Sequence, residues 1–150
     1  MSKKISICIP SSCGGHLREV RMIFGSNINY NLTYILNDKI NNKDFLTKNK
    51  VYYISHIENK FLLFINVFQC FFILRKIKPD FILSTGASPA FVVAILSKIF
   101  YRSKIIFIES ITRINRPSKT GMIMYGISDL FIYRHMNLRR YFPKGELFEL

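Results

Sequence analysis

The sequence predicts an α/β fold, a Rossmann-like parallel sheet with helices on both faces. Apolar runs of strand length alternate with helix-length segments along the 150 residues, and such alternation is typical of βαβ units. Small-residue turns follow two of the predicted strands, and an acidic residue follows a third. Because 49% of the residues are hydrophobic, the chain can fill one core, so we expect a single domain over residues 1–150.

The first half of the chain contains three of the predicted strands. The apolar run Ile5–Pro10 predicts a buried strand, and Gly15–Phe24 carries apolar residues at helical spacing. Tyr30–Leu36 alternates apolar and polar residues, as a half-buried strand does. The polar segment Asn37–Lys50 is predicted to be a loop, and Val51–Ile54 a short strand.

The second half continues the same alternation. Asn59–Ile77 is predicted to be a helix, which Pro79–Asp80 ends because proline cannot continue a helical ladder. Further strands are expected over Phe81–Ser84, Lys104–Ile108 and Leu130–Tyr133, and further helices over Ala90–Phe100 and Gly121–Gly126.

Three polar motifs come directly after predicted strands, at Ser12–His16, Thr85–Pro89 and Glu109–Ser110. In parallel sheets, ligands bind beyond the carboxyl ends of the strands. We therefore expect these motifs to line one crevice, although they lie far apart in the sequence.

The first motif, Gly14-Gly15-His16, places backbone N–H groups where a helix begins, an arrangement that suits a phosphate. His16 could then act as a general base or donate to an anion. The spacing is neither the dinucleotide fingerprint nor a P-loop. The alternative is a tight connection without a ligand.

The second motif includes Ser88, which suits a helix cap, and Pro89, which suits the first helical turn. A well-capped helix explains these two residues but not the small run Thr85–Ala87.

In the third motif, Glu109 could bind a sugar hydroxyl or orient a loop. The alternative is a surface ion pair with Arg113.

The formal net charge of +13 predicts an anionic partner: nucleic acid, acidic lipid headgroups or a phosphorylated substrate. The basic loop of Arg113, Arg116 and Lys119 could receive phosphate. Nucleic acid is disfavoured because most aromatic residues lie in apolar runs and no RNA-recognition, zinc or helix-turn-helix pattern occurs.

Cys8, Cys13 and Cys70 have neither metal-ligand spacing nor an even count, which favours a reducing cytoplasm. Met1–Lys4 leaves no room for a signal peptide or an N-terminal anchor before the first strand. No metal and no cofactor are expected.

The segment Phe61–Leu74 is apolar except for Asn66 and Gln69, and it is too short to span a bilayer, which needs about 20 residues. Basic residues follow at Arg75, Lys76 and Lys78. Two interpretations remain: a buried helix, or a helix lying in the membrane interface.

The chain resembles the bacterial capsule and exopolysaccharide proteins called PssD or CpsF. These are similar to the membrane-side subunit of the eukaryotic two-subunit N-acetylglucosamine transferase that acts on a dolichol-diphosphate sugar. The resemblance covers nearly all of the chain and rests on the order and spacing of several segments. These are Ser11–Leu17, Lys78–Ala87, Phe107–Ile114, Pro117–Gly121, Tyr125, Ser128–Ile132 and Tyr141–Lys144. The chain departs from it at Arg134–His135, where members often carry Gln-Trp.

The resemblance implies the N-terminal, acceptor-side half of a split GT-B glycosyltransferase. A small partner subunit would supply the donor half and bind the UDP-sugar. The acceptor would be a sugar on a polyprenyl diphosphate at an anionic membrane surface, so the chain would lie in the cytoplasm at the inner face of the cell membrane. An alternative is a non-catalytic subunit that recruits a separate catalytic chain to the membrane.

The resemblance also implies roles for particular residues. Catalytic roles are expected for His16 and Glu109. Acceptor or phosphate binding is expected for Ser12, Gly14, Gly15, Thr85, Gly86, Ala87, Ser88 and Arg113.

Overall fold

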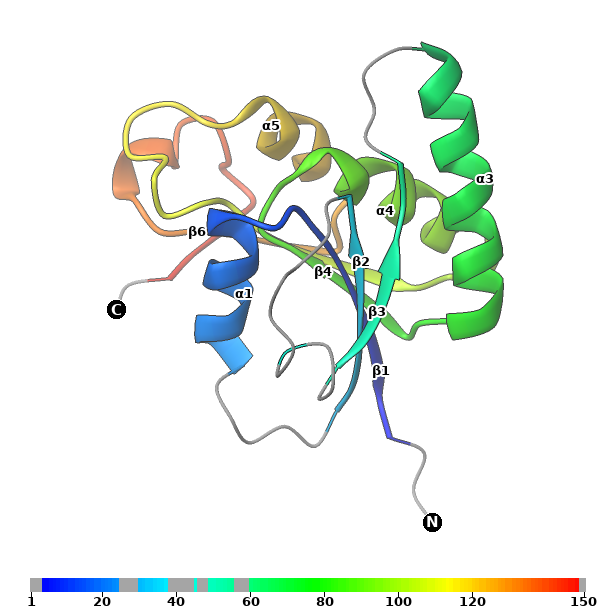
Figure 1. Ribbon diagram of the computed structural model, residues 1–150. Coiled ribbons are helices and arrows are strands. Elements are labelled where there is room, and N and C mark those ends of the chain that lie inside the picture. The colour runs from blue at the N-terminus through cyan, green and yellow to red at the C-terminus, as the bar shows by residue number, and fades with distance from the viewer. Residues whose placement is uncertain (1–3, 25–29, 38–44, 46–48, 56–59, 149–150) are drawn as a thin grey trace.

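Seven parallel strands form one sheet in the computed structural model, in the order β3-β2-β1-β4-β5-β6-β7 (Figure 1). The strands are β1 (Ser6–Ser11), β2 (Asn31–Leu36), β3 (Lys50–Tyr53), β4 (Phe81–Ser84), β5 (Lys104–Ile108), β6 (Leu130–Tyr133) and β7 (Glu146–Leu147). The helices are α1 (Gly15–Phe24), α3 (Lys60–Ile77), α4 (Ser88–Tyr101), α5 (Lys119–Tyr125) and the 3-10 helix η1 (Met136–Leu138). The predicted fold class is confirmed.

The structure describes residues 4–24, 30–37, 45, 49–55 and 60–148. Most of the predicted loop Asn37–Lys50, the predicted helix start at Asn59 and the first three residues lie outside these ranges.

Two apolar layers cover the two faces of the sheet. Strand side chains alternate between faces, so Ile7 and Ile9 pack with Leu17 and Val20 of α1 on one face. Helices α3, α4 and α5 cover the opposite face (Figure 1), where the core cluster includes Cys8 of β1, Cys70 of α3, Val93 of α4 and Met124 of α5. The helices therefore lie on both faces, as the sequence predicts.

Two cysteines lie inside the second layer, both fully buried. Burial raises the pKa of the Cys70 thiol to about 12, and it raises the pKa of Cys8 with a smaller contribution from the neighbouring Cys70. These thiols serve as core side chains and are not poised for nucleophilic chemistry at neutral pH.

Two aspartates tie strands together at the amino edge of the sheet. The backbone N–H of Ser6 donates to Asp80 Oδ2 at 2.9 Å, and that of Ile105 donates to Asp129 Oδ2 at 2.9 Å. Lys98 and Lys104 lie 3.6 and 3.4 Å from the Asp129 carboxylate. Desolvation raises the pKa of Asp129, but the Ile105 hydrogen bond and the two lysines outweigh it and lower that pKa below its usual value.

Most predicted boundaries lie within one or two residues of the observed ones, but the predicted cap of α4 is wrong. The helix begins at Ser88, and its N-cap residue is Ala87, which has no side-chain cap bond. Pro89 falls in the first turn, as predicted. The sequence did not predict η1 or the two-residue strand β7.

The strand order fixes where the site can form. Strands β1 and β4 are neighbours, and the helices that follow them, α1 and α4, leave on opposite faces. The carboxyl edge between β1 and β4 is therefore the point where a crevice opens in a doubly wound sheet.

Candidate functional site

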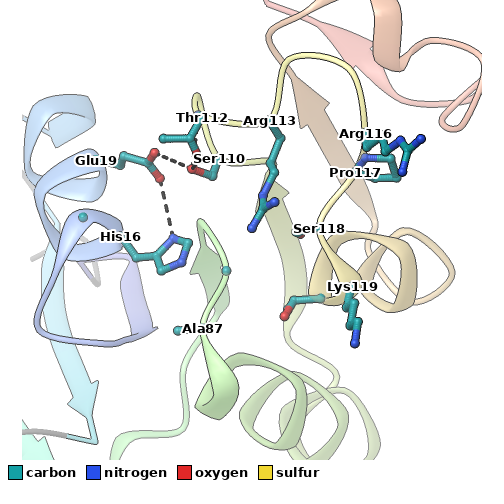
Figure 2. Close-up of a pocket in the computed structure, with 13 residues that line it drawn as sticks. His16, Glu19, Ala87, Ser110, Thr112, Arg113, Arg116, Pro117, Ser118 and Lys119 are labelled. Carbon is teal, nitrogen blue, oxygen red and sulfur yellow. Dashed lines mark hydrogen bonds and ion pairs between the residues drawn. The ribbon is translucent and has the colours of Figure 1, made fainter.

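A cavity of about 700 Å³ lies at this edge (Figure 2). Its walls come from the start of α1, the β4–α4 turn and the segment between β5 and α5. The lining residues are Gly15, His16, Glu19, Gly86, Ala87, Ser110, Thr112, Arg113, Arg116, Pro117, Ser118, Lys119 and Thr120. All three predicted motifs thus meet at one edge, and each has a residue in or directly behind the cavity wall.

The start of α1 leaves its backbone accessible. A Cβ built on Gly14 or on Gly15 meets no atom within 4 Å, so packing within the described protein does not require glycine at either position. The turn is closed by the Arg18 N–H, which donates to the Gly14 carbonyl at 3.2 Å. An open backbone at a helix N-terminus is suited to close approach by an anion.

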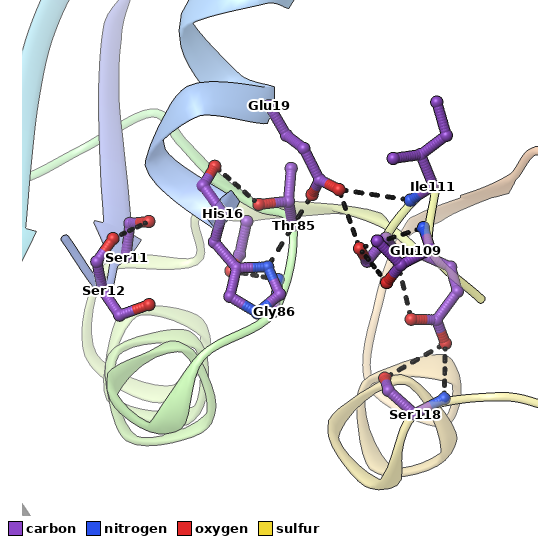
Figure 3. Close-up of polar contacts among 12 residues, drawn as sticks. Ser11, Ser12, His16, Glu19, Thr85, Gly86, Glu109, Ile111 and Ser118 are labelled. Carbon is purple, nitrogen blue, oxygen red and sulfur yellow. Dashed lines mark hydrogen bonds and ion pairs between the residues drawn. The ribbon is translucent and has the colours of Figure 1, made fainter. Parts of the chain in front are cut away.

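His16 and Glu19 lie one turn apart on α1 and face the cavity together (Figures 2 and 3). His16 Nδ1 lies 3.7 Å from Glu19 Oε2, and neither of these two buried atoms has a hydrogen-bond partner in the described part of the chain. Glu19 Oε1 accepts from Ser110 Oγ at 2.7 Å and from the Ile111 N–H at 3.2 Å. The carboxylate therefore bridges α1 and the segment after β5.

The turn after β4 is pinned to the turn after β1. Ser84 Oγ donates to the Pro10 carbonyl at 3.3 Å and accepts from the Gly86 N–H at 3.2 Å. Thr85 Oγ1 donates to the His16 carbonyl at 3.1 Å. Gly86 has φ +110°, and a Cβ there would come within 3.0 Å of His16 Cε1. Glycine at position 86 therefore makes room for the imidazole.

Ala87 lines the cavity in a strained conformation. Its φ is 128° and its ψ is 155°, a combination that is nearly restricted to glycine and costs about 1–3 kcal/mol for other residues. Such strain is often found at functional sites.

Glu109 is 1% exposed and lies behind the cavity wall. Its Oε1 accepts from the Ser110 N–H, and its Oε2 accepts from the N–H and the hydroxyl of Ser118, each at 3.1 Å (Figure 3). The Ser118 hydroxyl also caps α5 by accepting from the Gly121 N–H at 2.8 Å. A Cβ on Gly121 would overlap the Glu109 carboxylate. Glu109 thus orients the loop, and the alternative of a surface ion pair with Arg113 is wrong because the carboxylate is buried.

Cationic side chains form the wall opposite α1. Arg113, Arg116 and Lys119 line the cavity, and Figure 2 shows Arg113 extending toward the space between His16 and α5. The ring of His135 supports this loop, because its Nε2 donates to the Ile111 carbonyl at 2.8 Å. Glu19 is the single acidic side chain among the lining residues, so the cavity favours an anionic ligand.

The predicted site residues fall into two groups. Gly15, His16, Gly86, Ala87 and Arg113 line the cavity. The other five are not among the lining residues: Ser12, Gly14, Thr85, Ser88 and Glu109. Sequence reasoning missed Glu19, although the His-x-x-Glu spacing in a predicted helix places both side chains on one face. It also missed Thr112 and Thr120.

The arrangement can hold an anion and move a proton nearby. Nδ1 of His16 is buried beside Glu19, so Nε2 is the ring nitrogen that can meet a ligand. Within the described residues, no group of three or more His, Cys, Asp and Glu side chains could hold a metal ion.

Solved structures share this fold at low sequence identity. MurG from Acinetobacter baumannii matches with a TM-score of 0.69 at 12% identity, covering 97% of this chain and 44% of that protein. UDP-GlcNAc 2-epimerase from Methanocaldococcus jannaschii matches with a TM-score of 0.65 at 14% identity, covering 95% of this chain and 42% of that protein. The chain therefore has the fold of one half of a GT-B protein and spans less than half the length of these structures.

The chain belongs to the family described as "Oligosaccharide biosynthesis protein Alg14 like", which matches residues 46–149. The human protein named UDP-N-acetylglucosamine transferase subunit ALG14 is 27% identical over 179 aligned residues, covering 95% of this chain and 81% of that protein. The rat protein of the same name is 31% identical over 96 residues, which cover 61% of this chain and 44% of the rat protein.

Proposed function

We propose that this chain is the acceptor-binding subunit of a two-chain glycosyltransferase whose partner subunit binds the UDP-sugar. One observation carries the proposal: a single cavity combines an open glycine backbone, the His16–Glu19 pair and three cationic side chains. The relatives named as N-acetylglucosamine transferase subunits support UDP-N-acetylglucosamine as the donor.

The proposal of a donor-binding partner is supported by the names of the relatives, which describe each of them as a subunit of a transferase. A GT-B active site lies between two domains, and this chain spans 44% of the length of MurG. A small donor-binding subunit would face the carboxyl edge of the sheet and close the cavity. The transferred sugar would then lie between the two chains, with His16 on the acceptor side.

The acceptor in this proposal is a sugar on a polyprenyl diphosphate. Its diphosphate would meet the backbone N–H groups at Gly14 and Gly15 and the guanidinium of Arg113. Arg116 and Lys119 extend the same positive wall. The product would be a lipid-linked oligosaccharide, and the resemblance to PssD and CpsF favours capsule or exopolysaccharide synthesis at the inner face of the cell membrane.

The proposed reaction is a direct displacement. Nε2 of His16 takes the proton of the acceptor hydroxyl as its oxygen attacks the anomeric carbon of the donor sugar. The new oxygen–carbon bond forms while the bond to the diphosphate breaks, and UDP leaves with the electron pair. Glu19 lies beside Nδ1 and would place a carboxylate next to the imidazolium that forms in this step.

A non-catalytic role is the second candidate. In that case the chain would only bring a catalytic partner to the membrane, and His16 would do no chemistry. The exposed phenylalanines of α3 support this role.

Transfer assays of the assembled complex separate the two candidates. The chain is co-purified with a donor-binding partner and supplied with UDP-N-acetylglucosamine, other UDP-sugars and a short-chain polyprenyl-diphosphate sugar. His16→Ala should reduce kcat by about 10²–10⁴-fold without loss of the complex. An unchanged kcat would refute the catalytic role of His16 and support recruitment alone.

Anion binding can be tested on the chain without its partner. Inorganic pyrophosphate should raise the thermal unfolding temperature, and Arg113→Gln should weaken that effect. Arg18→Gln removes an equal charge from an exposed position outside the cavity lining and should leave the effect intact. Equal responses in the two variants would contradict a phosphate site at Arg113.

A further inference from the structure

Helix α3 exposes a stripe of phenylalanines from Phe61 to Phe72. Phe61, Phe64, Phe68 and Phe72 are 73, 67, 62 and 59% exposed, and their spacing of three and four residues keeps them on one side of the helix. On an ordinary protein surface, exposed apolar residues are scattered singly, whereas here four large aromatic side chains are aligned on one helix.

The opposite side of α3 explains how the helix is fixed. Asn66, Cys70 and Leu74 are buried against the protein. The side chain of Asn66 donates to the Ser55 carbonyl at 2.7 Å, and Gln69 accepts from the Ser55 N–H at 2.8 Å. The interpretation of α3 as a buried helix therefore holds for this side only, and the phenylalanine side is exposed.

The stripe continues onto the neighbouring helix. The ring of Phe71 contacts Phe72 at 5.9 Å and Phe100 of α4 at 5.2 Å between centroids. Phe100 and Ile99 are themselves exposed. We call Phe61, Phe64, Phe68, Phe72 and Phe100 the phenylalanine face.

The charged residues within α3 and α4 have one sign. Neither α3 nor α4 contains an aspartate or glutamate. Their charged residues are all lysine or arginine, and exposed cations stand at or just after the C-terminal ends of both helices: Arg75, Lys76, Lys78, Lys98 and Arg102. Of these, Lys98 also lies 3.6 Å from the Asp129 carboxylate. Aromatic side chains bordered by cations are complementary to the boundary between anionic headgroups and acyl chains.

We infer that the phenylalanine face is a docking surface for an anionic lipid bilayer. Among the described residues, no helix is long and apolar enough to cross a membrane, and this face would instead bind in the plane of the headgroups. This inference deepens the proposed function by naming the surface that meets the membrane. Only the delivery of a lipid-linked acceptor from that membrane rests on the proposed function.

The position of α3 fits this use. The helix follows β3 and so begins at the carboxyl edge of the sheet, where its first turns extend beyond the strand ends (Figure 1). Phe61 and Phe64 lie on these turns. The cavity opens at the same edge, so a lipid-linked acceptor could reach it from the bound bilayer.

A tryptophan reporter tests the inference directly, because the chain contains no tryptophan. Phe68→Trp should show a blue-shifted emission and quenching by brominated acyl chains when mixed with phosphatidylcholine vesicles containing phosphatidylglycerol. Met22→Trp is the matched control, since Met22 is 74% exposed on α1. A reporter at position 68 that stays unchanged, or responds no more than the one at position 22, overturns the inference.

Vesicle co-sedimentation measures what the face contributes. Phe64→Ala combined with Phe68→Ala should weaken binding by at least about tenfold, whereas Met22→Ala with Ile23→Ala should not. Arg75→Gln with Lys76→Gln should weaken binding by about 25-fold, from about fivefold per cation. Arg18→Gln with Arg139→Gln removes the same charge from elsewhere on the exposed surface and should have a smaller effect.

Other occupants of the face give different results. If the chain dimerises without lipid and the double alanine variant is a monomer, the face binds a second copy and the inference is wrong. If that variant keeps vesicle binding but loses the partner subunit, the face binds protein and the inference is again wrong. Transfer to a water-soluble acceptor should survive in the variant, so failure of membrane docking and failure of the proposed reaction can be distinguished.

Discussion

His16 Nδ1 lies 3.7 Å from Glu19 Oε2, one turn further along α1. The other oxygen of that carboxylate accepts hydrogen bonds from Ser110 Oγ and the Ile111 N–H. The segment after β5 therefore fixes the carboxylate, and the carboxylate lies beside one nitrogen of the imidazole. Since Nδ1 is buried beside Glu19, Nε2 is the nitrogen of His16 that can meet a ligand in the cavity.

The first prediction concerns Glu19 as a positioning residue for His16. Glu19→Gln should lower kcat by about tenfold with little change in KM, because the neutral amide no longer places a negative charge beside the imidazolium that forms in the transition state. In a His16→Ala background the same substitution should have little further effect, since two residues that act as a unit are not additive. The measurement is a double-mutant cycle of kcat in the assembled complex.

The loop contact of Glu19 provides the control for that cycle. Glutamine keeps a carbonyl oxygen that can still accept from Ser110 Oγ, whereas Ser110→Ala removes this contact and leaves the carboxylate. If Ser110→Ala lowers kcat as much as Glu19→Gln does, Glu19 acts by holding the loop. Additive effects of the substitutions at Glu19 and His16 would show that the two residues do not act as a unit.

The second prediction concerns the open backbone at Gly15. A Cβ there has no neighbour within 4 Å, so Gly15→Ala should leave the thermal unfolding temperature nearly unchanged. It should nevertheless weaken pyrophosphate binding and raise the KM for the acceptor by about tenfold or more, since the methyl group occupies space that the ligand needs. Gly126→Ala is the control, because its Cβ would make ordinary contact at 3.7 Å with the Ile123 carbonyl. Unaltered ligand binding in Gly15→Ala would place the anion elsewhere.

Much of the fold could be predicted because the strands are apolar and the breakers between them are unambiguous. The alternation in β2 and the apolar run in β1 are strong signals. The short elements could not be predicted in this way, because η1 and the two-residue β7 depend on tertiary contacts and carry no periodicity of their own. The sequence does not determine the cap of α4, because Ser88 suits the cap and the first helical position equally, and the strained backbone of Ala87 has no signature in the sequence.

The sequence predicts which segments meet at the candidate site, but not which of their residues face the cavity. Topology brings strand ends together, so Gly15, His16 and Arg113 could be assigned to one crevice. The sequence could not show whether Glu109 faces the cavity or the protein, since either orientation follows a buried strand. An argument from strand ends does not reach Glu19, because this residue lies in the second turn of α1.

The third prediction concerns the buried contact between Glu109 and the start of α5. Glu109→Gln replaces one acceptor oxygen by an amide that faces donors, so it should lower the free energy of unfolding by about 1–3 kcal/mol. Gly121→Ala should be destabilising by a similar amount, because its Cβ overlaps the same carboxylate. Urea unfolding measures both. A combination of the two substitutions that destabilises by the full sum would show that they do not act at one contact.

The fourth prediction concerns the strain at Ala87. Ala87→Gly should raise the free energy of unfolding by about 1 kcal/mol, because release of the strained φ outweighs the extra entropy of glycine in the unfolded chain. Ala87→Val should be destabilising by more than this amount, since a branched side chain tolerates positive φ less well. Thermal and urea unfolding give the sign. A destabilised Ala87→Gly variant would contradict strain at this residue.

The fifth prediction concerns acid stability through Asp129. Desolvation raises its pKa, but the Ile105 N–H and the charges of Lys98 and Lys104 lower it by a larger amount. The net pKa therefore lies below the usual 3.8. A group whose pKa is lower in the folded state stabilises the fold above its unfolded pKa and loses that contribution as the pH falls through the folded value. Asp129→Asn should therefore be less stable than the parent near neutral pH, and the difference should shrink below about pH 4.

Urea unfolding of both proteins at neutral and acid pH tests this, with Asp129→Glu as a variant that keeps the charge but displaces it from the Ile105 N–H. A difference between parent and Asp129→Asn that is the same at acid and neutral pH would show that the carboxylate charge contributes nothing, leaving the backbone contact of Asp129 as its whole effect.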